Sequence, residues 1–176
     1  MPDGERLDSY RRFMRWFSNH LLVTEMTPAA FKDALRNGRT YVVAEGIGTP
    51  AGFDFYAETS AGVKDLGQTI EASLAPKLVA KKPHVVEYPG TAADVRLVLK
   101  RIGDQTAEIV KESAGDLEAE GLAPGVYYVE AAFTPNYLRP LFKSKRVADQ
   151  YVKEFTWIYS GAIRINRRDI DDYFGR

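Results

Sequence analysis

The strongest strand pattern in the chain runs from Gly125 to Phe133 and begins at a Pro-Gly pair, which is typical of a turn. The segment is rich in β-branched and aromatic residues and carries a single charge, on Glu130. This pattern predicts a central strand of a sheet. Strand alternation divides its side chains between two faces, with Tyr127, Val129 and Ala131 on one and Val126, Tyr128 and Glu130 on the other.

Shorter segments of the same kind follow one another along the chain, separated by turn-forming residues. We predict strands at 39–45, 53–57, 68–74, 77–80, 95–102, 107–112, 116–120, 156–159 and 162–165, and a loop at 59–67. The segment 116–120 also fits a helix, but the turn directly after it favours a strand. We expect the strand at 156–159, continued at 162–165, to be the companion of Gly125–Phe133.

Helical spacing is most evident near the start of the chain. An amphipathic helix is predicted over 7–23, because five apolar residues share one stripe there. These residues are Tyr10, Phe13, Met14, Phe17 and Leu21. A second helix is predicted over 27–38, where Thr27 suits the N-cap, Pro28 the first turn and Gly38 the left-handed position at the end. A short helix is expected at 146–152.

Together these patterns predict an α+β fold that is mainly β, with N-terminal helices followed by an antiparallel, immunoglobulin-like β-sandwich. We expect a helical preface at 1–38, a β-rich sandwich domain at 39–166 and a C-terminal tail at 167–176. Proline and glycine punctuation allows a boundary between subregions near 81–92.

The composition excludes several classes of function. With 24 basic and 24 acidic side chains the formal net charge is zero, so no overall field attracts nucleic acid or an anionic membrane. The chain has no cysteine, which excludes thiolate nucleophiles, Cys-ligated zinc and disulfides. No apolar run is long enough to span a bilayer, and the first residues lack the pattern of a signal peptide. The cellular compartment stays open.

No residue stands in a catalytic motif, and we predict no catalytic, cofactor-binding or metal-binding residue in this chain. The two histidines, His20 and His84, lie far apart in sequence and belong to no metal-ligand pattern. The glycine-spaced segment 46–52 resembles a phosphate-binding loop, but it contains Pro50 and leads into a strand, so we interpret it as a hairpin turn. Asp54 is interpreted as an outward-facing residue of that strand.

Two groups of side chains are candidates for contacting a partner. Tyr127, Tyr128, Trp157 and Tyr159 could form a sugar-binding aromatic platform, although packing in the core or on the sheet is the ordinary role of such residues. Basic residues could contact nucleic acid, although a solvated face is the commoner role. They are Arg11, Arg12 and Arg15 near the start, and Lys143, Lys145 and Arg146 later on.

Several segments resemble proteins of the PHP (polymerase and histidinol phosphatase) superfamily. They are FMRWFSNHLLV at 13–23, ALRNGRTYVV at 34–43, GTPAGFDFYA at 48–57, PGVYYVE at 124–130 and WIYSGAI at 157–163. In that family the first three come after the metal-binding barrel, and the last two belong to a C-terminal sheet region. The family commonly has Arg at the place of Tyr128 and Asn-Pro at that of Gly161-Ala162, so the chain departs from its pattern there.

PHP proteins are typically metal-dependent phosphoesterases or related hydrolases, with clustered His and Asp ligands on the barrel. The resemblance implies that this chain is a non-catalytic accessory region that packs on or shapes such a barrel. A divalent metal is then expected only in the barrel upstream, and no cofactor in this chain. Asn19 and His20 are the matched polar pair that could approach the site of the barrel.

The contact candidates are therefore Asn19, His20, Trp157 and Tyr159. The alternative to an accessory region is a stand-alone β-sandwich module that binds carbohydrate or protein through exposed aromatic side chains. Nucleic-acid binding is a third hypothesis and requires strongly salt-dependent affinity.

Overall fold

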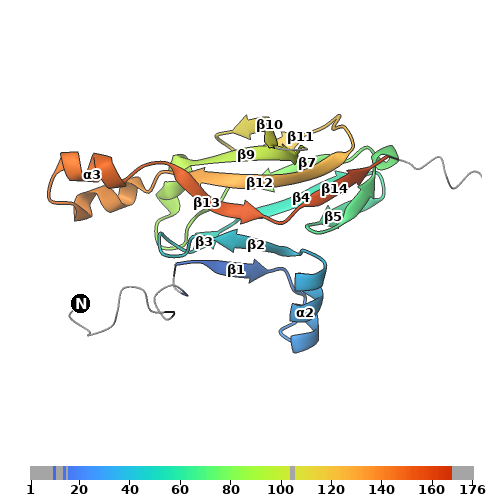
Figure 1. Cartoon of the computed structure of the whole chain (residues 1–176), viewed down its shortest axis with the longest axis horizontal. Helices are drawn as coiled ribbons and strands as arrows, with labels where there is room; N and C mark the ends of the chain where they lie inside the picture. Colours follow the sequence, from blue (N-terminus) through green and yellow to red (C-terminus); the bar gives the residue numbers. More distant parts are fainter. Residues whose placement is uncertain (1–9, 11–13, 15, 104–105, 168–176) are drawn as a thin grey trace, which may run out of the picture.

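The computed structural model describes residues 10, 14, 16–103 and 106–167 and is mainly β (Figure 1). The strands are β1 (Ser18–Leu21), β2 (Thr40–Val43), β3 (Pro50–Ala51), β4 (Asp54–Thr59), β5 (Gly62–Asp65), β6 (Thr69–Glu71), β7 (Lys77–Lys81), β8 (His84–Val85), β9 (Val95–Ile102), β10 (Ala107–Ser113), β11 (Leu117–Ala119), β12 (Gly125–Phe133), β13 (Phe155–Ser160) and β14 (Ile163–Asn166). The α-helices are α2 (Pro28–Arg36) and α3 (Lys145–Tyr151), and the 3-10 helices are η1 (Ala72–Leu74), η2 (Pro89–Asp94) and η3 (Asn136–Leu141).

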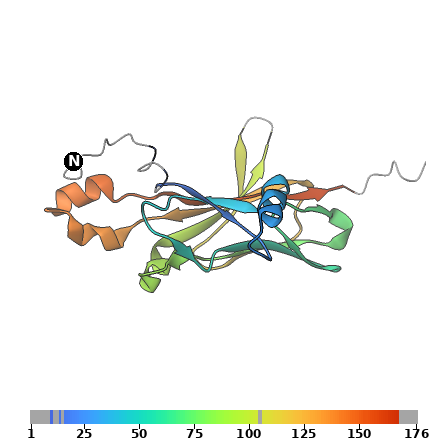
Figure 2. The same cartoon turned by 90° about the horizontal axis from the view of Figure 1, so that it is seen from below.

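The strands form two main sheets that face each other. In the larger sheet β9 joins β10 to β12, and β12 is followed by β13, β2 and β1 along one part of its length and by β14 and β6 along the other. The smaller sheet has the order β11-β7-β4-β5, and β3 pairs with β8 separately. Figure 2 shows the yellow-green hairpin of β9 and β10 projecting from the body of the molecule.

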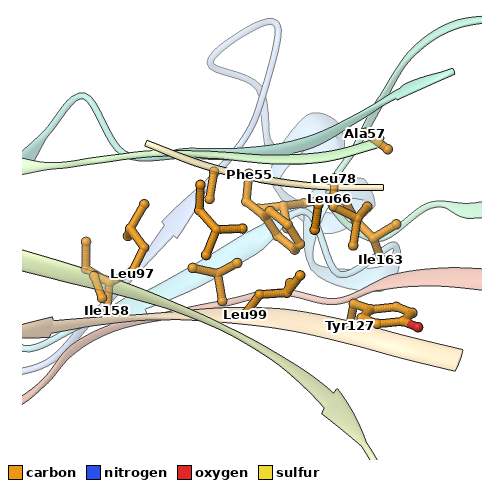
Figure 3. Close-up of a cluster of buried hydrophobic side chains, with 14 of the residues drawn as sticks. Phe55, Ala57, Leu66, Leu78, Leu97, Leu99, Tyr127, Ile158 and Ile163 are labelled. Carbon is orange, nitrogen blue, oxygen red and sulfur yellow. The ribbon is translucent and has the colours of Figure 1, made fainter. Parts of the chain in front are cut away.

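The core lies between the two sheets. Figure 3 shows side chains of the smaller sheet, such as Phe55 and Leu78, pointing toward Leu97, Leu99 and Tyr127 of the larger one. All five side chains have at most 1% of their surface exposed. Burial of large apolar side chains, at about 25 cal/mol per Å², is the main force that holds the two layers together.

The alternation expected for the central strand is confirmed. On β12, Tyr127, Val129 and Ala131 are fully buried. On the opposite face Val126 and Tyr128 are half-exposed, whereas Glu130 is only 9% exposed. β12 pairs with β9 along Tyr127–Phe133 on one edge, and with β13 and β14 on the other. The predicted pairing with 156–159 and 162–165 is thus confirmed.

The companion of β12 is one strand interrupted at Gly161 and Ala162. β13 ends at Ser160 and β14 begins at Ile163, yet both run antiparallel to β12. The polar groups exposed by the break find partners nearby. The Ser160 hydroxyl accepts a hydrogen bond from Val129 N at 2.8 Å, and the Ala162 carbonyl accepts one from Gly67 N at 2.9 Å. This satisfies backbone groups that would be costly to leave unpaired when buried.

Three glycines pack closely together at this interruption. A Cβ on Gly161 would lie 2.5 Å from the Gly38 carbonyl oxygen, and one on Gly67 would lie 1.7 Å from the Asn37 carbonyl oxygen. Gly38 and Gly67 also have positive φ values of 66° and 82°, which favour glycine. The backbone that connects α2 to β2 therefore packs directly against Gly161 and Gly67, and a residue with a side chain would clash at either position.

The helix α2 has the capping that its sequence predicts. Thr27 accepts a hydrogen bond from Ala30 N at 3.2 Å, and Pro28 occupies the first turn. At the other end Gly38 N donates to Leu35 O and Arg39 N donates to Ala34 O, at 3.3 Å and 2.9 Å. This is the Schellman arrangement, which pairs the last carbonyls of a helix.

Two strands of the N-terminal half lie where a helix and a loop were predicted. The helix expected over 7–23 ends in a strand instead, since β1 occupies Ser18–Leu21 and pairs with β2; the residues 7–9, 11–13 and 15 lie outside the described part. The loop expected at 59–67 contains β5, which pairs with β4. In both places tertiary pairing outweighs the local pattern. Strands were predicted correctly at β2, β4, β7, β9, β10 and β11, and the short helix at 146–152 corresponds to α3. The strand expected at 68–74 is correct only over β6, because η1 follows it.

Replacement of Gly67 tests the crowded junction. We expect Gly67→Ala to lower the free energy of unfolding by about 3 kcal/mol, because the methyl group adds a clash with Asn37 to an unfavourable positive φ. Gly62→Ala is the matched control: Gly62 has a φ of 100° but no atom within 4 Å of its Cβ position. It should cost about 1 kcal/mol. Chemical denaturation measures both, and equal losses would contradict the crowding.

Candidate functional site

Two of the contact candidates, Asn19 and Tyr159, lie in one row across the outer face of the larger sheet. Asn19 pairs with Val42 of β2, Val42 pairs with Tyr159 of β13, and Tyr159 pairs with Glu130 of β12. Residues paired across strands point to the same face of a sheet. The sheet thus brings together side chains from distant parts of the chain.

We call Asn19, Val42 and Tyr159 of this row, together with Phe17, the outer-face patch; three of its four side chains are apolar and exposed. Phe17 has 63% of its surface exposed, Tyr159 46% and Val42 37%. Phe17 directly precedes β1, which is the edge strand of the sheet. Apolar side chains and an open strand edge therefore adjoin each other here.

His20 lies on the opposite side of the sheet from its neighbour Asn19. Its ring stacks on Tyr41 with centroids 4.8 Å apart, and its Nε2 lies 2.5 Å from Glu45 Oε1. Glu45 also accepts hydrogen bonds from the hydroxyls of Ser18, at 2.9 Å, and Thr49, at 2.7 Å. Asn19 and His20, the polar pair singled out by the resemblance, thus lie in different environments: Asn19 is exposed and His20 is half-buried.

The arrangement around Glu45 holds the loop after β2 rather than activating a nucleophile. In a hydrolytic triad the serine hydroxyl is bonded to the histidine. Here Ser18 donates to Glu45, and so its hydroxyl is not bonded to His20. Burial raises the pKa of Glu45, but the hydrogen bonds from His20, Thr49 and Ser18 outweigh it and leave the pKa below its ordinary value of 4.5.

Trp157 belongs to the core, not to a contact surface. The pairing of β12 with β13 shifts register here: Ala131 pairs with Ile158, but Ala132 pairs with Thr156. Trp157 has no partner on β12 and is therefore the extra residue of a β-bulge. Its side chain is fully buried and its Nε1 donates to Gly48 O at 3.0 Å. Alternation alone would have placed Trp157 on the same face as Tyr159; the bulge turns it inward.

The remaining aromatic candidates are divided in the same way. Tyr127 is fully buried, and its hydroxyl donates to Ala123 O at 2.5 Å. Tyr128 is half-exposed on the outer face, two positions from Glu130, which pairs with Tyr159. Of the four residues of the proposed platform, only Tyr128 and Tyr159 are therefore accessible to a ligand.

The glycine-spaced segment 46–52 contains a turn but is not the hairpin that we predicted, because β2 and β4 belong to different sheets and Pro50–Ala51 forms β3. The carbonyl groups of the segment are used internally. Trp157 donates to Gly48 O, and the Tyr137 hydroxyl donates to Ile47 O. A Cβ on Gly48 would lie 2.8 Å from the Val85 side chain. The backbone of this segment packs against protein rather than around a phosphate.

Next to the outer-face patch the sheet carries paired charges. Lys100 Nζ lies 2.7 Å from Glu130 Oε1, and Thr156 donates to the other oxygen of Glu130 at 3.3 Å. The hydrogen bond to Glu130 is the largest cause that raises the pKa of Lys100, so the lysine stays charged. Arg96 lies 2.7 Å from both Glu112 and Glu154. These charges are compensated within the sheet.

Other residues singled out in the sequence lie apart from this surface. Asp54 is exposed at the start of β4, as expected for an outward-facing residue. His84 is half-buried on β8. Of the basic cluster, Lys145 pairs with Asp149 at 2.6 Å, while Lys143 and Arg146 are exposed. Arg11, Arg12 and Arg15 fall outside the described residues.

Across residues 10, 14, 16–103 and 106–167, no group of three or more His, Cys, Asp or Glu side chains is placed to hold a metal ion. In the same residues, none of the helices has the length and apolar character needed to cross a membrane.

Comparison with known proteins adds no relative: no family model, no curated protein and no solved structure matches the chain.

The contribution of Glu45 should depend on pH. Its folded pKa is lower than its unfolded pKa, so its stabilisation is present above about pH 4.5 and is lost as the pH falls through the folded pKa. We expect Glu45→Gln to lower the free energy of unfolding by about 1 kcal/mol at pH 7 and by almost nothing at low pH. Urea denaturation as a function of pH measures this, with the exposed Glu87→Gln as control. A loss that does not vary with pH would contradict the role given to the carboxylate.

Proposed function

We propose that this chain is a non-catalytic accessory domain of a PHP-type metal-dependent phosphoesterase, and that it packs on the catalytic barrel through the outer-face patch. The observation that carries the proposal is the patch itself, in which Phe17, Val42 and Tyr159 expose apolar surface beside Asn19. Contiguous exposed apolar surface beside polar residues is typical of a contact with another protein. The resemblance to PHP proteins supplies the identity of the partner.

We further propose that the fold is immunoglobulin-like, and the strand order supports this. The sheet β11-β7-β4 corresponds to strands E, B and A of that fold, and β10-β9-β12-β14 to strands C′, C, F and G. The hydrogen bond from the Tyr127 hydroxyl to Ala123 O, near the start of the strand equivalent to F, is that of a tyrosine corner. The hairpin of β1 and β2 would then be an addition to the edge next to β13.

The position of this added hairpin favours a docking role. β1 is an edge strand, and an open edge beside apolar side chains invites unwanted pairing unless something covers it. A barrel packed on the outer-face patch would cover both. The neighbouring carboxylates are already satisfied, Glu45 by three side chains and Glu130 by Lys100 and Thr156, which suits a supporting role better than proton transfer.

A hydrolysis assay tests whether the chain does chemistry alone. The purified chain, supplied with Mn²⁺ or Zn²⁺, should not hydrolyse p-nitrophenyl phosphate above the rate of the buffer, because a PHP barrel provides the metal ligands in this proposal. Hydrolysis that follows the chain through purification and is abolished by a chelator would refute the accessory role.

An association assay tests the docking surface. We expect a PHP barrel to be encoded next to this chain and to form a complex with it when the two are co-expressed. Replacing Val42 and Tyr159 by serine should weaken the complex about tenfold or more, which corresponds to about 1.4 kcal/mol. Val63→Ser is the matched control, since Val63 is 63% exposed but lies on β5 of the other sheet. The absence of a barrel gene, or equal affinity of all variants, would contradict the proposal.

A stand-alone binding module for carbohydrate or protein is the second candidate. It is favoured by Tyr128 and Tyr159, which share the outer face with the polar groups of Lys100 and Glu130. Aromatic faces beside hydrogen-bonding groups are suited to sugars. In that case Tyr159→Ala would abolish oligosaccharide binding measured by calorimetry, and no barrel would be required.

A further inference from the structure

At the opposite end of β13 from α3 lie α2, β5 and β14 (Figure 1). Residues of these elements and of the segments next to them line a basic groove. It consists of two adjoining hollows of about 440 and 280 Å³ that share Asn37, Gly67, Gln68 and Thr69. We call it the junction groove, because Gly67 is also one of the glycines at the interruption between β13 and β14. The close packing of Gly67 against Asn37 therefore holds one part of the groove lining in place.

The lining of the junction groove is unusual in its charge. It includes four basic side chains, Arg36, Arg39, Lys64 and Arg164, and no carboxylate. The hollow on the outer face of the larger sheet instead combines two basic residues with three glutamates. The hollow beside η1 has one lysine and two glutamates. In a chain whose formal net charge is zero, this groove is a local concentration of positive charge.

The four cations come from different parts of the chain. Arg36 is in the last turn of α2, Arg39 follows Gly38, Lys64 is on β5 and Arg164 is on β14. β14 is held beside the loop by parallel pairing with β6, in which Arg164 pairs with Thr69. Convergence of basic residues from separate elements requires the folded structure, so it differs from a run of like charges along one exposed helix.

Neutral donors complete the lining. The side-chain oxygen of Gln68 accepts a hydrogen bond from Asp65 N at 3.1 Å, which leaves its NH₂ group as the free end. The Thr69 hydroxyl lies on the same segment and is exposed. Two of the carbonyls at the end of α2, which would repel an anion, are paired: Leu35 O accepts from Gly38 N and Ala34 O from Arg39 N.

Arg39 is only partly neutralised by the protein. One of its terminal nitrogens pairs with Asp33, yet its Nε is buried and has no hydrogen-bond acceptor within the described residues. Buried polar atoms nearly always have a partner. The Nε is not accessible to a ligand, but the side chain is 30% exposed and lines the groove, so the guanidinium contributes positive charge there.

We propose that the junction groove binds the phosphate group of a small ligand, either free phosphate or a phosphate monoester. Arginine offers planar pairs of donors that match phosphate oxygens, and lysine adds a mobile positive charge. The amide of Gln68 and the hydroxyl of Thr69 are further donors to such oxygens. This site is separate from the outer-face patch and does not depend on the accessory role proposed above.

The test is a titration of the ¹⁵N-labelled chain with inorganic phosphate, followed by NMR at constant ionic strength maintained with chloride. We expect saturable shifts concentrated at the amides of Asn37, Gly67, Gln68 and Thr69. The double variant Lys64→Gln/Arg164→Gln should weaken binding about fivefold or more. The matched control, Lys143→Gln/Arg146→Gln, also removes one lysine and one arginine, from an exposed cluster, and should leave the affinity unchanged.

Glucose 6-phosphate and glucose distinguish the two sources of the phosphate group. Tighter binding of the ester than of phosphate assigns the groove to a phosphate monoester, and the reverse assigns it to free phosphate; glucose alone should not bind. Circular dichroism checks that both double variants are folded. Shifts spread over all basic surfaces, an equal loss of affinity in the two double variants, or no saturation would overturn the proposal. None of these results bears on association with a barrel.

Discussion

The structure depends on the pairing of β12 with a neighbouring strand that is interrupted between β13 and β14. β13 and β14 lie end to end along the same edge of β12, and the Ser160 hydroxyl supplies the hydrogen bond that the break removes. The interruption also lets two different groups of strands join the sheet: β2 and β1 beside β13, and β6 beside β14. Because Gly161 and Gly67 pack against the backbone that follows α2, both additions are fixed at one point.

Sequence patterns identified the parts of the fold whose local preferences agree with their packing. The alternation of β12, the caps of α2 and the strands β9 and β10 could all be predicted from local chemistry. β1 could not, because the residues before it have helical spacing and its strand forms only by pairing with β2. β5 has an exposed, polar sequence without alternation, so only its pairing with β4 reveals it.

The candidate site was predictable only in part, for geometrical reasons. Asn19 and Tyr159 were both chosen from the sequence, but their place in one row follows from the registers of β1, β2 and β13. Trp157 was chosen for the same reason as Tyr159, and a one-residue bulge turns it into the core. The junction groove gave no signal at all, because its four basic residues are scattered along the chain and meet only in the folded structure.

The interrupted strand also determines the order in which the protein can be completed. β2 and β6 belong to the first half of the chain, yet each takes its place in the sheet by pairing with a strand near the other end. During synthesis these segments must wait for residues 155–166 to leave the ribosome before they can dock. Pairing between such distant segments gives the topology a high contact order and slows folding. Unpaired strand edges of this kind make a partly folded chain prone to aggregation.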